Sequence, residues 1–348
     1  MMKAIVYEEF KGQLKLDNLP DPVPNDDGVV IQLKASGLCL SDWHGWMGND
    51  KDIKLPHVPG HELAGVIVEV GKNVKNFKVD DGVTVPFVSG CGNCEQCNTG
   101  NQQICDHQFQ PGFTNWGSFA QYVSLNYADE NLVTIPEEID FITAASLGCR
   151  FATSFRGVVD QGKTKQDDWV VIHGCGGVGL SAIMIAKALG AKIIAIDINE
   201  DTLTLAKQLG ADHSINSQFE KNVVGKIVDL TNGGANISID ALGHPAVLLN
   251  SISCLKKRGR HVQIGIMKEE FTQSKIPIDL IIGRELEIVG SHGMQAHRYN
   301  EMLEMIKKGE LQPAKLVSNT VALHDVIELL PQLNTSKTAG IQIINDFV

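Results

Sequence analysis

The sequence predicts an α/β protein of two domains, one rich in strands and one containing a doubly wound parallel sheet. Three observations support this fold class: the length, the short apolar segments between Lys3 and Phe87, and the alternation of strands and helices after Asp168. The chain has 348 residues, whereas one domain usually holds roughly 100–200. We therefore expect two hydrophobic cores rather than one.

Composition and charge exclude several classes of protein. Hydrophobic residues make up 43% and charged residues 20% of the chain, as in a folded globular protein rather than a disordered one. The net charge of −11 is spread without a basic block, so a nucleic-acid backbone would be repelled. The sequence has no run of about 18 apolar residues and no apolar secretion signal at its start. We therefore expect a cytoplasmic protein that binds neither nucleic acid nor membrane.

Short apolar segments separated by Gly and Pro are typical of strands. In the first part of the chain they lie at residues 4–7, 29–33 and 64–70. The end of the chain shows two helical patterns and a closing strand, near residues 299–308, 325–330 and 341–344. We expect this tail to rejoin the first domain, so that residues 1–150 and 290–348 form the strand-rich domain.

Strands and amphipathic helices alternate in the middle of the chain. The expected strands lie at residues 169–173, 192–197, 237–240 and 261–264. The expected helices between them lie at residues 178–189, 200–209 and 245–255. This alternation predicts a parallel sheet with helices on both faces, formed by residues 151–289.

A glycine-rich loop joins the first of these strands to its helix. Gly174-Cys175-Gly176-Gly177-Val178-Gly179 fits G-x-G-x-x-G, in which glycines allow a tight turn and let a pyrophosphate approach the helix N-terminus. Asp197 ends the next strand, where a carboxylate can bind both ribose hydroxyls and repel a 2′-phosphate. The loop therefore predicts NAD as cofactor. The alternative is that the glycines only form a turn and that Asp197 caps the following helix.

Four of the eight cysteines lie close together in a loop. Cys91, Cys94, Cys97 and Cys105 follow C-x2-C-x2-C-x7-C, which favours a closed tetrahedral zinc site that braces the loop. An iron–sulfur cluster is the alternative, but the Cys-Pro pair typical of ferredoxin-type sequences is missing. Cys175 and Cys254 are left over, and we expect them to be buried or incidental thiols.

A second metal site is indicated by residues far apart in the sequence. Cys39, His61 and Cys149 would give zinc two thiolates and an imidazole and leave its fourth position open. Taken singly, a Cys is usually a small buried residue and a His a hydrogen-bonded one. Asp42 and Glu62 can likewise be surface or capping carboxylates. The dinucleotide domain favours the metal site, because such a domain needs a substrate site at its crevice.

Together these motifs resemble the zinc-containing alcohol dehydrogenases of the medium-chain dehydrogenase/reductase family over nearly the full length. The motifs are Cys39-x-Ser41-Asp42-x-His44, Gly60-His61-Glu62, the four-cysteine loop, Gly148-Cys149-Arg150-Phe151-Ala152-Thr153, and Gly174–Gly179 with Asp197. The resemblance implies a GroES-like fold for the strand-rich domain and a Rossmann fold for the dinucleotide domain. It also implies a homo-oligomer, either a dimer or a tetramer.

The resemblance also assigns roles to single residues. Cys39, His61 and Cys149 would hold a catalytic zinc, Asp42 would orient His61, and Glu62 could approach the metal. Ser41 and His44 would carry the alcohol proton outward through the nicotinamide ribose. The implied cofactor-binding residues are Thr153, Gly174, Gly176, Gly177, Val178, Gly179, Asp197, Ile264 and Ile266. Phe87 and Trp46 are candidates either for the substrate pocket wall or for ordinary core packing.

The function implied is hydride transfer between a primary or secondary alcohol and NAD, giving an aldehyde or ketone and NADH, with two zinc ions per chain. One alternative is a polyol or amino-alcohol dehydrogenase of the sorbitol or threonine type, against which stands Cys149. Another is a non-catalytic NAD-sensing zinc protein, against which stand Ser41, His44 and the open-site ligands. Leu40 and Ile341 replace arginines that bind pyrophosphate in many relatives, so we hypothesise weak NADH binding, measurable by fluorescence titration.

Overall fold

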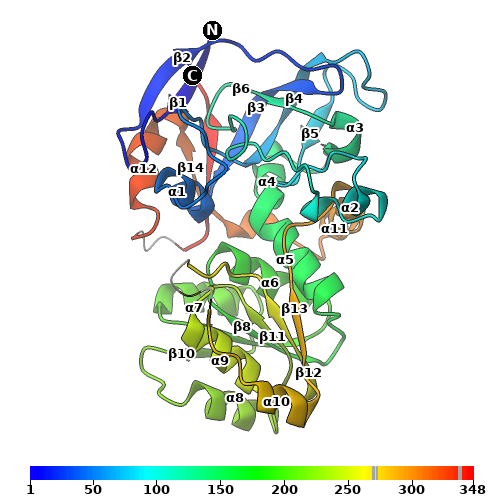
Figure 1. The fold of residues 1–348 in the computed structure, drawn as a ribbon. Coiled ribbons are helices and arrows are strands. Elements are labelled where there is room, and N and C mark those ends of the chain that lie inside the picture. Colours follow the sequence, from blue (N-terminus) through cyan, green and yellow to red (C-terminus); the bar gives the residue numbers. More distant parts are fainter. Residues whose placement is uncertain (269–270, 272, 336–338) are drawn as a thin grey trace. The chain divides into compact units, whose positions relative to one another are not determined.

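The computed structural model describes residues 1–268, 271, 273–335 and 339–348 and divides into two compact units. Unit 1 comprises Met1–Ala152, Gly293–Lys308 and Pro313–Val348, and unit 2 comprises Thr153–His292 and Gly309–Gln312. Unit 1 is therefore discontinuous in sequence, and in Figure 1 the red end of the chain lies among its blue and cyan strands. None of the described helices is long and apolar enough to cross a membrane.

Unit 1 is built around a seven-stranded sheet in the order β14-β15-β3-β4-β5-β7, with β6 paired to β3. Its strands are β3 (Val29–Leu38), β4 (Glu62–Val70), β5 (Gly82–Thr84), β6 (Tyr122–Leu125), β7 (Val133–Thr134), β14 (Val317–Ala322) and β15 (Ile341–Asp346). The β14–β15 pair is parallel and the other pairs are antiparallel. A separate hairpin joins β1 (Met2–Val6) to β2 (Lys15–Leu19).

The tail of the chain completes this sheet. Ile343 of β15 pairs with Gly37 of β3, in a register that also sets Gln342 opposite Leu38. Buried apolar residues of β3 and β4, among them Ile31 and Ile67, form one core of unit 1. The short helices of the unit are α1 (Leu40–Trp46), α2 (Glu95–Asn98), α3 (Ala128–Asn131), α4 (Phe141–Ala145), α11 (Tyr299–Lys307) and α12 (Val326–Gln332).

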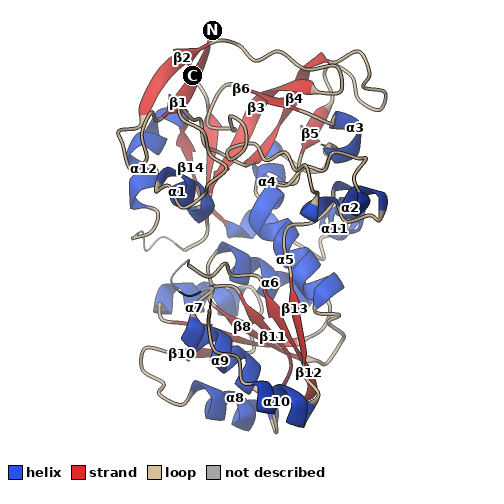
Figure 2. Ribbon diagram, viewed as in Figure 1, coloured by secondary structure: helices blue, strands red, loops and turns tan. Residues whose placement is uncertain are grey.

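Unit 2 contains a parallel six-stranded sheet in the order β10-β9-β8-β11-β12-β13. Its strands are β8 (Trp169–His173), β9 (Lys192–Asp197), β10 (His213–Asn216), β11 (Ala235–Asp240), β12 (Leu255–Gln263) and β13 (Glu287–Gly290). Its helices are α6 (Gly177–Ala188), α7 (Glu200–Gln208), α8 (Val223–Thr231), α9 (Pro245–Ser253) and α10 (Ile278–Arg284), and Figure 2 shows helices on both faces of the sheet. The strand order reverses between β8 and β11, which is where such sheets bind their ligands.

The predicted fold class is confirmed, with differences in local detail. Strand β10 and helix α8 were not expected from the sequence. β10 shows no clear apolar period over its short length, whereas α8 has one that the sequence analysis missed, since its buried residues Val223, Ile227 and Thr231 lie four residues apart. The helix expected over residues 245–255 ends at Ser253, and β12 begins at Leu255 rather than at His261. The early part of β12 contains three exposed basic residues, Lys256, Lys257 and Arg258, which hide the strand from a search for apolar segments.

The closing strand gives a first prediction, because Ile343 in β15 is fully buried. Ile343→Ala leaves a cavity between β14, β15 and β3, and we expect it to cost unit 1 about 3 kcal/mol in free energy of unfolding. Differential scanning calorimetry would measure the lower melting temperature. Val348→Ala, at a residue that is 86% exposed, is the control, and an Ile343→Ala melting curve equal to that of the control contradicts this role of β15.

Candidate active site

The pairing of β3 with β4 brings the first two predicted metal ligands together. The register sets Gly37 opposite Glu62, so Cys39 follows the end of one strand while His61 precedes the start of its neighbour. The ligand atoms of Cys39, His61, Glu62 and Cys149 all lie within 4.8 Å of one another. Residues from three separate segments therefore form one group of metal-binding side chains within unit 1.

Cys149 reaches this group from a π-helical turn, Leu147–Phe151, that lies between α4 and α5 (Ala152–Arg156). The carbonyl of Gly148 accepts a hydrogen bond from the Phe87 amide at 3.1 Å and from the Tyr299 hydroxyl at 3.4 Å. A Cβ at Gly148 would lie 3.3 Å from the Glu62 Cα. Because the turn packs this closely on the start of β4, the position of the Cys149 thiol is fixed by the strand pair. Turns of this kind often occur at functional sites.

Asp42 orients the imidazole of His61. Its Oδ1 accepts a hydrogen bond from His61 Nδ1 at 2.7 Å and from the Gly60 amide at 3.1 Å, and its Oδ2 accepts from the Cys39 amide at 3.0 Å. The proton on Nδ1 leaves a lone pair on Nε2, which is buried and has no hydrogen-bond partner among the described residues. A buried lone pair facing two thiols fits a zinc ion, whose histidine ligands are usually held this way by a carboxylate.

The electrostatics of the two thiols are opposite, because the hydrogen bond between them, together with burial, raises the pKa of the Cys149 thiol well above its usual range. A hydrogen bond from Cys149 lowers the pKa of the buried Cys39 thiol well below its usual range, and the nearby Arg150 cation acts in the same direction. Zinc binds cysteine as thiolate. The site therefore favours the ionised form of a ligand before any metal is added.

Glu62 is held by a partner that the sequence analysis did not identify as a site residue. Its Oε1 accepts hydrogen bonds from the Arg150 amide at 3.1 Å and from Arg150 Nε at 3.0 Å, and its Oε2 accepts from Nη2. Burial raises the pKa of Glu62, whereas the Arg150 charge opposes that shift. The sequence signal that could have identified Arg150 is an arginine next to the ligand Cys149 and between two large apolar residues. The structure shows that both of these residues, Leu147 and Phe151, are fully buried.

The two predicted relay residues lie on one face of α1. Ser41 and His44 are three residues apart, a spacing that puts side chains on the same face of a helix. The Cys39 thiol is 3.7 Å from Ser41 Oγ, and His44 Nδ1 lies 3.0 Å from Asn49 Nδ2. Ser41 thus borders the group of metal-binding side chains, and His44 is one helical turn further along.

Two phenylalanines lie against His61, one of which the sequence analysis missed. The ring centroids of Phe87 and Phe113 are 6.2 Å and 5.1 Å from that of His61. Phe113 follows Gly112 in a loop with no strand or helix signal, so its proximity depends on long-range packing. Trp46 instead donates from Nε1 to the Gly12 carbonyl and packs with the core around α12. Of the two roles considered for Trp46, pocket wall and core packing, the structure favours core packing.

The four cysteines of the loop also converge. The Sγ atoms of Cys91, Cys94, Cys97 and Cys105 all lie within 4.8 Å of one another and are buried. Cys94 caps α2, and the Cys97 amide hydrogen bond lowers the pKa of its thiol to about 6. Since four thiolates complete a tetrahedron, this geometry suits a zinc ion without a position for substrate.

The glycine loop of unit 2 has the geometry that a pyrophosphate needs. Gly174 has a φ of +86°, and a Cβ at Gly179 would lie 1.8 Å from the Gly174 carbonyl oxygen. Gly176, the N-cap of the 12-residue helix α6, has open space where a Cβ would stand. The loop therefore leaves free amides at a helix N-terminus open to an anion.

Asp197 ties the end of β9 to this loop. Its Oδ2 accepts from the Cys175 amide at 2.7 Å, and its Oδ1 accepts from the amides of Ile198 and Asn199. Asn199, not Asp197, caps α7, so the alternative role of Asp197 as helix cap is wrong. The sequence analysis missed the neighbouring Ile198 and Leu242, which are 65% and 57% exposed; apolar residues exposed at this edge of the sheet suit a flat base.

The remaining candidate cofactor residues of unit 2 differ in exposure. Thr153 has a buried hydroxyl without a hydrogen-bond partner among the described residues. Val178 and Ile264 are half-buried, whereas Ile266 is 81% exposed. The predicted burial of the leftover thiols is confirmed, since Cys175 and Cys254 are fully buried.

The two positions at which many relatives carry a pyrophosphate-binding arginine differ in exposure. Leu40 is 44% exposed at the start of α1, whereas Ile341 is 1% exposed in β15. An arginine at residue 341 would bury its charge in the sheet. Only the exposed position of Leu40 is therefore comparable with the position of a phosphate-binding arginine.

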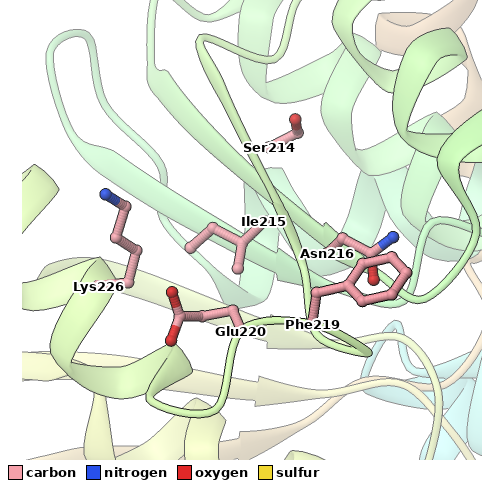
Figure 3. A pocket seen from close by; sticks show the side chains of 6 residues that line it. All are labelled: Ser214, Ile215, Asn216, Phe219, Glu220 and Lys226. Carbon is pink, nitrogen blue, oxygen red and sulfur yellow. The ribbon is translucent and has the colours of Figure 1, made fainter.

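A cavity at the edge of unit 2 contains none of the predicted site residues. It has a volume of about 350 Å³. Figure 3 shows its lining side chains from β10, the loop after it and α8, namely Ser214, Ile215, Asn216, Phe219, Glu220 and Lys226. We assign the cavity no role, because it lies beside the edge strand β10, two strands away from β8 and its glycine loop.

Comparison with known proteins gives matches along the whole chain. The family "Alcohol dehydrogenase GroES-like domain" matches residues 25–137, and the family "Zinc-binding dehydrogenase" matches residues 177–308. An "Alcohol dehydrogenase" of Geobacillus stearothermophilus is 31% identical, over 97% of each chain. A "NAD-dependent alcohol dehydrogenase" of Sulfurisphaera tokodaii is 32% identical, over 99% of each chain. The crystal structure of a benzyl alcohol dehydrogenase from Acinetobacter calcoaceticus is 28% identical and matches with a TM-score of 0.91 over 99% of each chain.

The two metal-binding groups predict the metal content. We expect about two zinc ions per chain, one for each group. Cys97→Ser should leave only the ion held by Cys39, His61 and Cys149, whereas Cys39→Ser should leave only the ion of the four-cysteine loop. Inductively coupled plasma mass spectrometry on protein purified with zinc measures both. Cys254→Ser, a buried thiol outside both groups, should keep two ions; retention of two ions in either of the other variants contradicts the assignment.

Proposed function

The chain belongs to the zinc-binding alcohol dehydrogenase family, and from that membership we propose that it oxidises a primary or secondary alcohol to the aldehyde or ketone with NAD as hydride acceptor. The observation that carries the proposal is the buried Nε2 of His61. It faces the thiols of Cys39 and Cys149 while Asp42 holds the other ring nitrogen. Two thiolates and an imidazole would hold a zinc ion and would leave it open to the substrate oxygen.

The residues around these donors divide the work of the reaction. Cys39, His61 and Cys149 would hold the zinc, which when bound would supply the Lewis acidity that lowers the pKa of the alcohol hydroxyl. Ser41 accepts the alcohol proton, and His44 passes it to solvent, because a proton path is needed from a site that excludes water. Phe87, with its ring near His61, forms the apolar wall against which the carbon chain of the substrate packs.

The cofactor-binding part of the proposal concerns unit 2. The amides of the loop Gly174–Gly179 bind the pyrophosphate of NAD, and Asp197 binds the adenosine ribose. Thr153, Val178, Ile264 and Ile266 contact the nicotinamide half. Ile198 and Leu242 hold the adenine between them, which explains why these apolar side chains are exposed.

Two other functions remain as alternatives. A polyol or amino-alcohol dehydrogenase would use the same fold, but the presence of Cys149 in the metal-binding group favours a zinc held by two thiolates and a histidine. A non-catalytic NAD-binding protein would have no need of Ser41, His44 and an orphaned imidazole nitrogen beside two thiols.

We also propose that the protein is a cytoplasmic homo-oligomer, a dimer or a tetramer. β13 is an edge strand of the described sheet and carries Ile288, which is 38% exposed. Helix α10, which packs on the neighbouring β12, exposes Ile282 and Ile278 by 70% and 56%. An apolar edge of this kind pairs readily with a second chain. None of the eight cysteines, all of which are described, forms a disulfide, as expected in a reducing compartment.

The proposed reaction is tested by NADH absorbance with a panel of simple alcohols, benzyl alcohol, polyols and threonine. We expect simple or aromatic alcohols to be oxidised best, and Cys39→Ala to lose about 1,000-fold or more in kcat/KM because the metal supplies several kcal/mol. Cys254→Ala is the control. Fastest oxidation of polyols or threonine supports the first alternative, and absence of any turnover in protein that contains both zinc ions supports the second.

The cofactor preference gives a further prediction. Asp197→Asn should lower kcat/KM for NAD by about 10-fold, because charged hydrogen bonds are worth about 1.5–3 kcal/mol, and should raise the NADP/NAD ratio. Steady-state kinetics with both cofactors measure the change. Asp201→Asn, an exposed carboxylate in the first turn of α7, should leave the ratio unaltered. An unaltered ratio in Asp197→Asn would show that Asp197 acts only on the loop.

A further inference from the structure

We infer that Arg150 is a positioning residue that keeps the Glu62 carboxylate off the metal, so that the fourth position stays open to the substrate. The inference rests on the proposed function and deepens it. It concerns two residues that each follow a metal ligand directly, since Glu62 follows His61 and Arg150 follows Cys149. The pair thus links the neighbours of two ligands.

The geometry holds both oxygens of the carboxylate. Oε1 accepts from the Arg150 amide and Nε, and Oε2 accepts from Nη2. Glu62 is fully buried and Arg150 is 8% exposed, so water does not compete for these hydrogen bonds. A planar guanidinium that meets a carboxylate with two donors fixes the orientation of the carboxylate as well as its position.

The backbone opposite the pair is shaped to receive it. Gly37 of β3 faces Glu62 across the strand pair, and a Cβ there would lie 2.3 Å from Glu62 Oε2 and 3.1 Å from Arg150 Nη2. A larger residue at 37 would displace the carboxylate from this position. The absence of a side chain at Gly37 is therefore part of the arrangement that keeps Glu62 with Arg150.

Glu62 needs a restraint because it is close enough to bind the metal itself. A carboxylate oxygen of Glu62 lies within 4.8 Å of the donors of Cys39, His61 and Cys149. Without Arg150, a buried unpaired carboxylate gains more from a divalent cation than from any other nearby group. It would then fill the position that an open zinc site offers to substrate.

The test uses the protein with Co²⁺ in place of zinc, because the visible spectrum of Co²⁺ reports the number and type of its ligands without any turnover. Difference spectra against wild type cancel the constant contribution of the four-cysteine site. We expect Glu62→Gln to leave the spectrum unchanged, since Glu62 is not a ligand. We expect Arg150→Met to change the spectrum as an oxygen ligand enters, and to lower kcat/KM by at least about 10-fold.

A double variant and a matched control sharpen this test. In Arg150→Met with Glu62→Gln, the charged carboxylate is gone, and we expect the spectrum to return to that of wild type. Arg298→Met removes an arginine of a surface ion pair with Glu301 and should leave the spectrum unaltered. Arg150→Lys keeps the charge but lacks the two-pronged guanidinium, so a smaller spectral change is expected, and this variant decides if Arg150→Met does not fold.

Two results overturn the inference. A changed spectrum in Glu62→Gln alone means that Glu62 already binds the metal in the native protein. Unchanged spectra in both Arg150 variants mean that the ion pair has a structural role only. Neither result depends on the proposed reaction, since the spectra are recorded without alcohol or NAD; loss of that proposal would instead appear as wild-type protein that oxidises no alcohol.

Discussion

The carboxylate of Asp42 is the interaction on which the metal site of unit 1 depends. With two oxygens it holds the Cys39 amide, the Gly60 amide and the ring of His61, three points in two segments that β3 and β4 bring together. Since Asp42 is 1% exposed, these hydrogen bonds are not exchanged for water. One buried charge thereby fixes the first ligand, the approach to the second, and the ring nitrogen that the second presents.

The same principle appears at the glycine loop, where Asp197 accepts hydrogen bonds from the Cys175 amide and from the residues that follow β9. In each unit a carboxylate organises the backbone around a site, from the first turn of α1 in the case of Asp42 and from the end of β9 in the case of Asp197. The carboxylate of Asp42 accepts its hydrogen bonds from groups of the protein itself. That of Asp197 combines the internal role with the proposed recognition of ribose, since an anionic oxygen can accept more than one hydrogen bond.

The sequence predicts those features whose chemistry lies within a short segment. The four-cysteine loop and the glycine loop are local, and their spacing alone indicates their geometry. The fold class follows from period and alternation, whereas β10 and the basic start of β12 lack an apolar signal. Arg150 and Phe113 could not be assigned from the sequence, because their partners Glu62 and His61 lie in distant segments. Such contacts are decided by strand register and by the packing of the π-helical turn.

The order in which the chain is synthesised gives β15 a particular importance. Unit 2 is almost continuous in sequence, so it can fold as soon as its residues have emerged from the ribosome. β3 and β4 emerge earlier but must wait for β15, which is made after unit 2 is complete. During that interval the backbone edge of β3 at Ser36, Gly37 and Leu38 is uncovered and open to pairing with other chains. The half of the protein that holds the metals is therefore the one whose biogenesis most needs protection from aggregation.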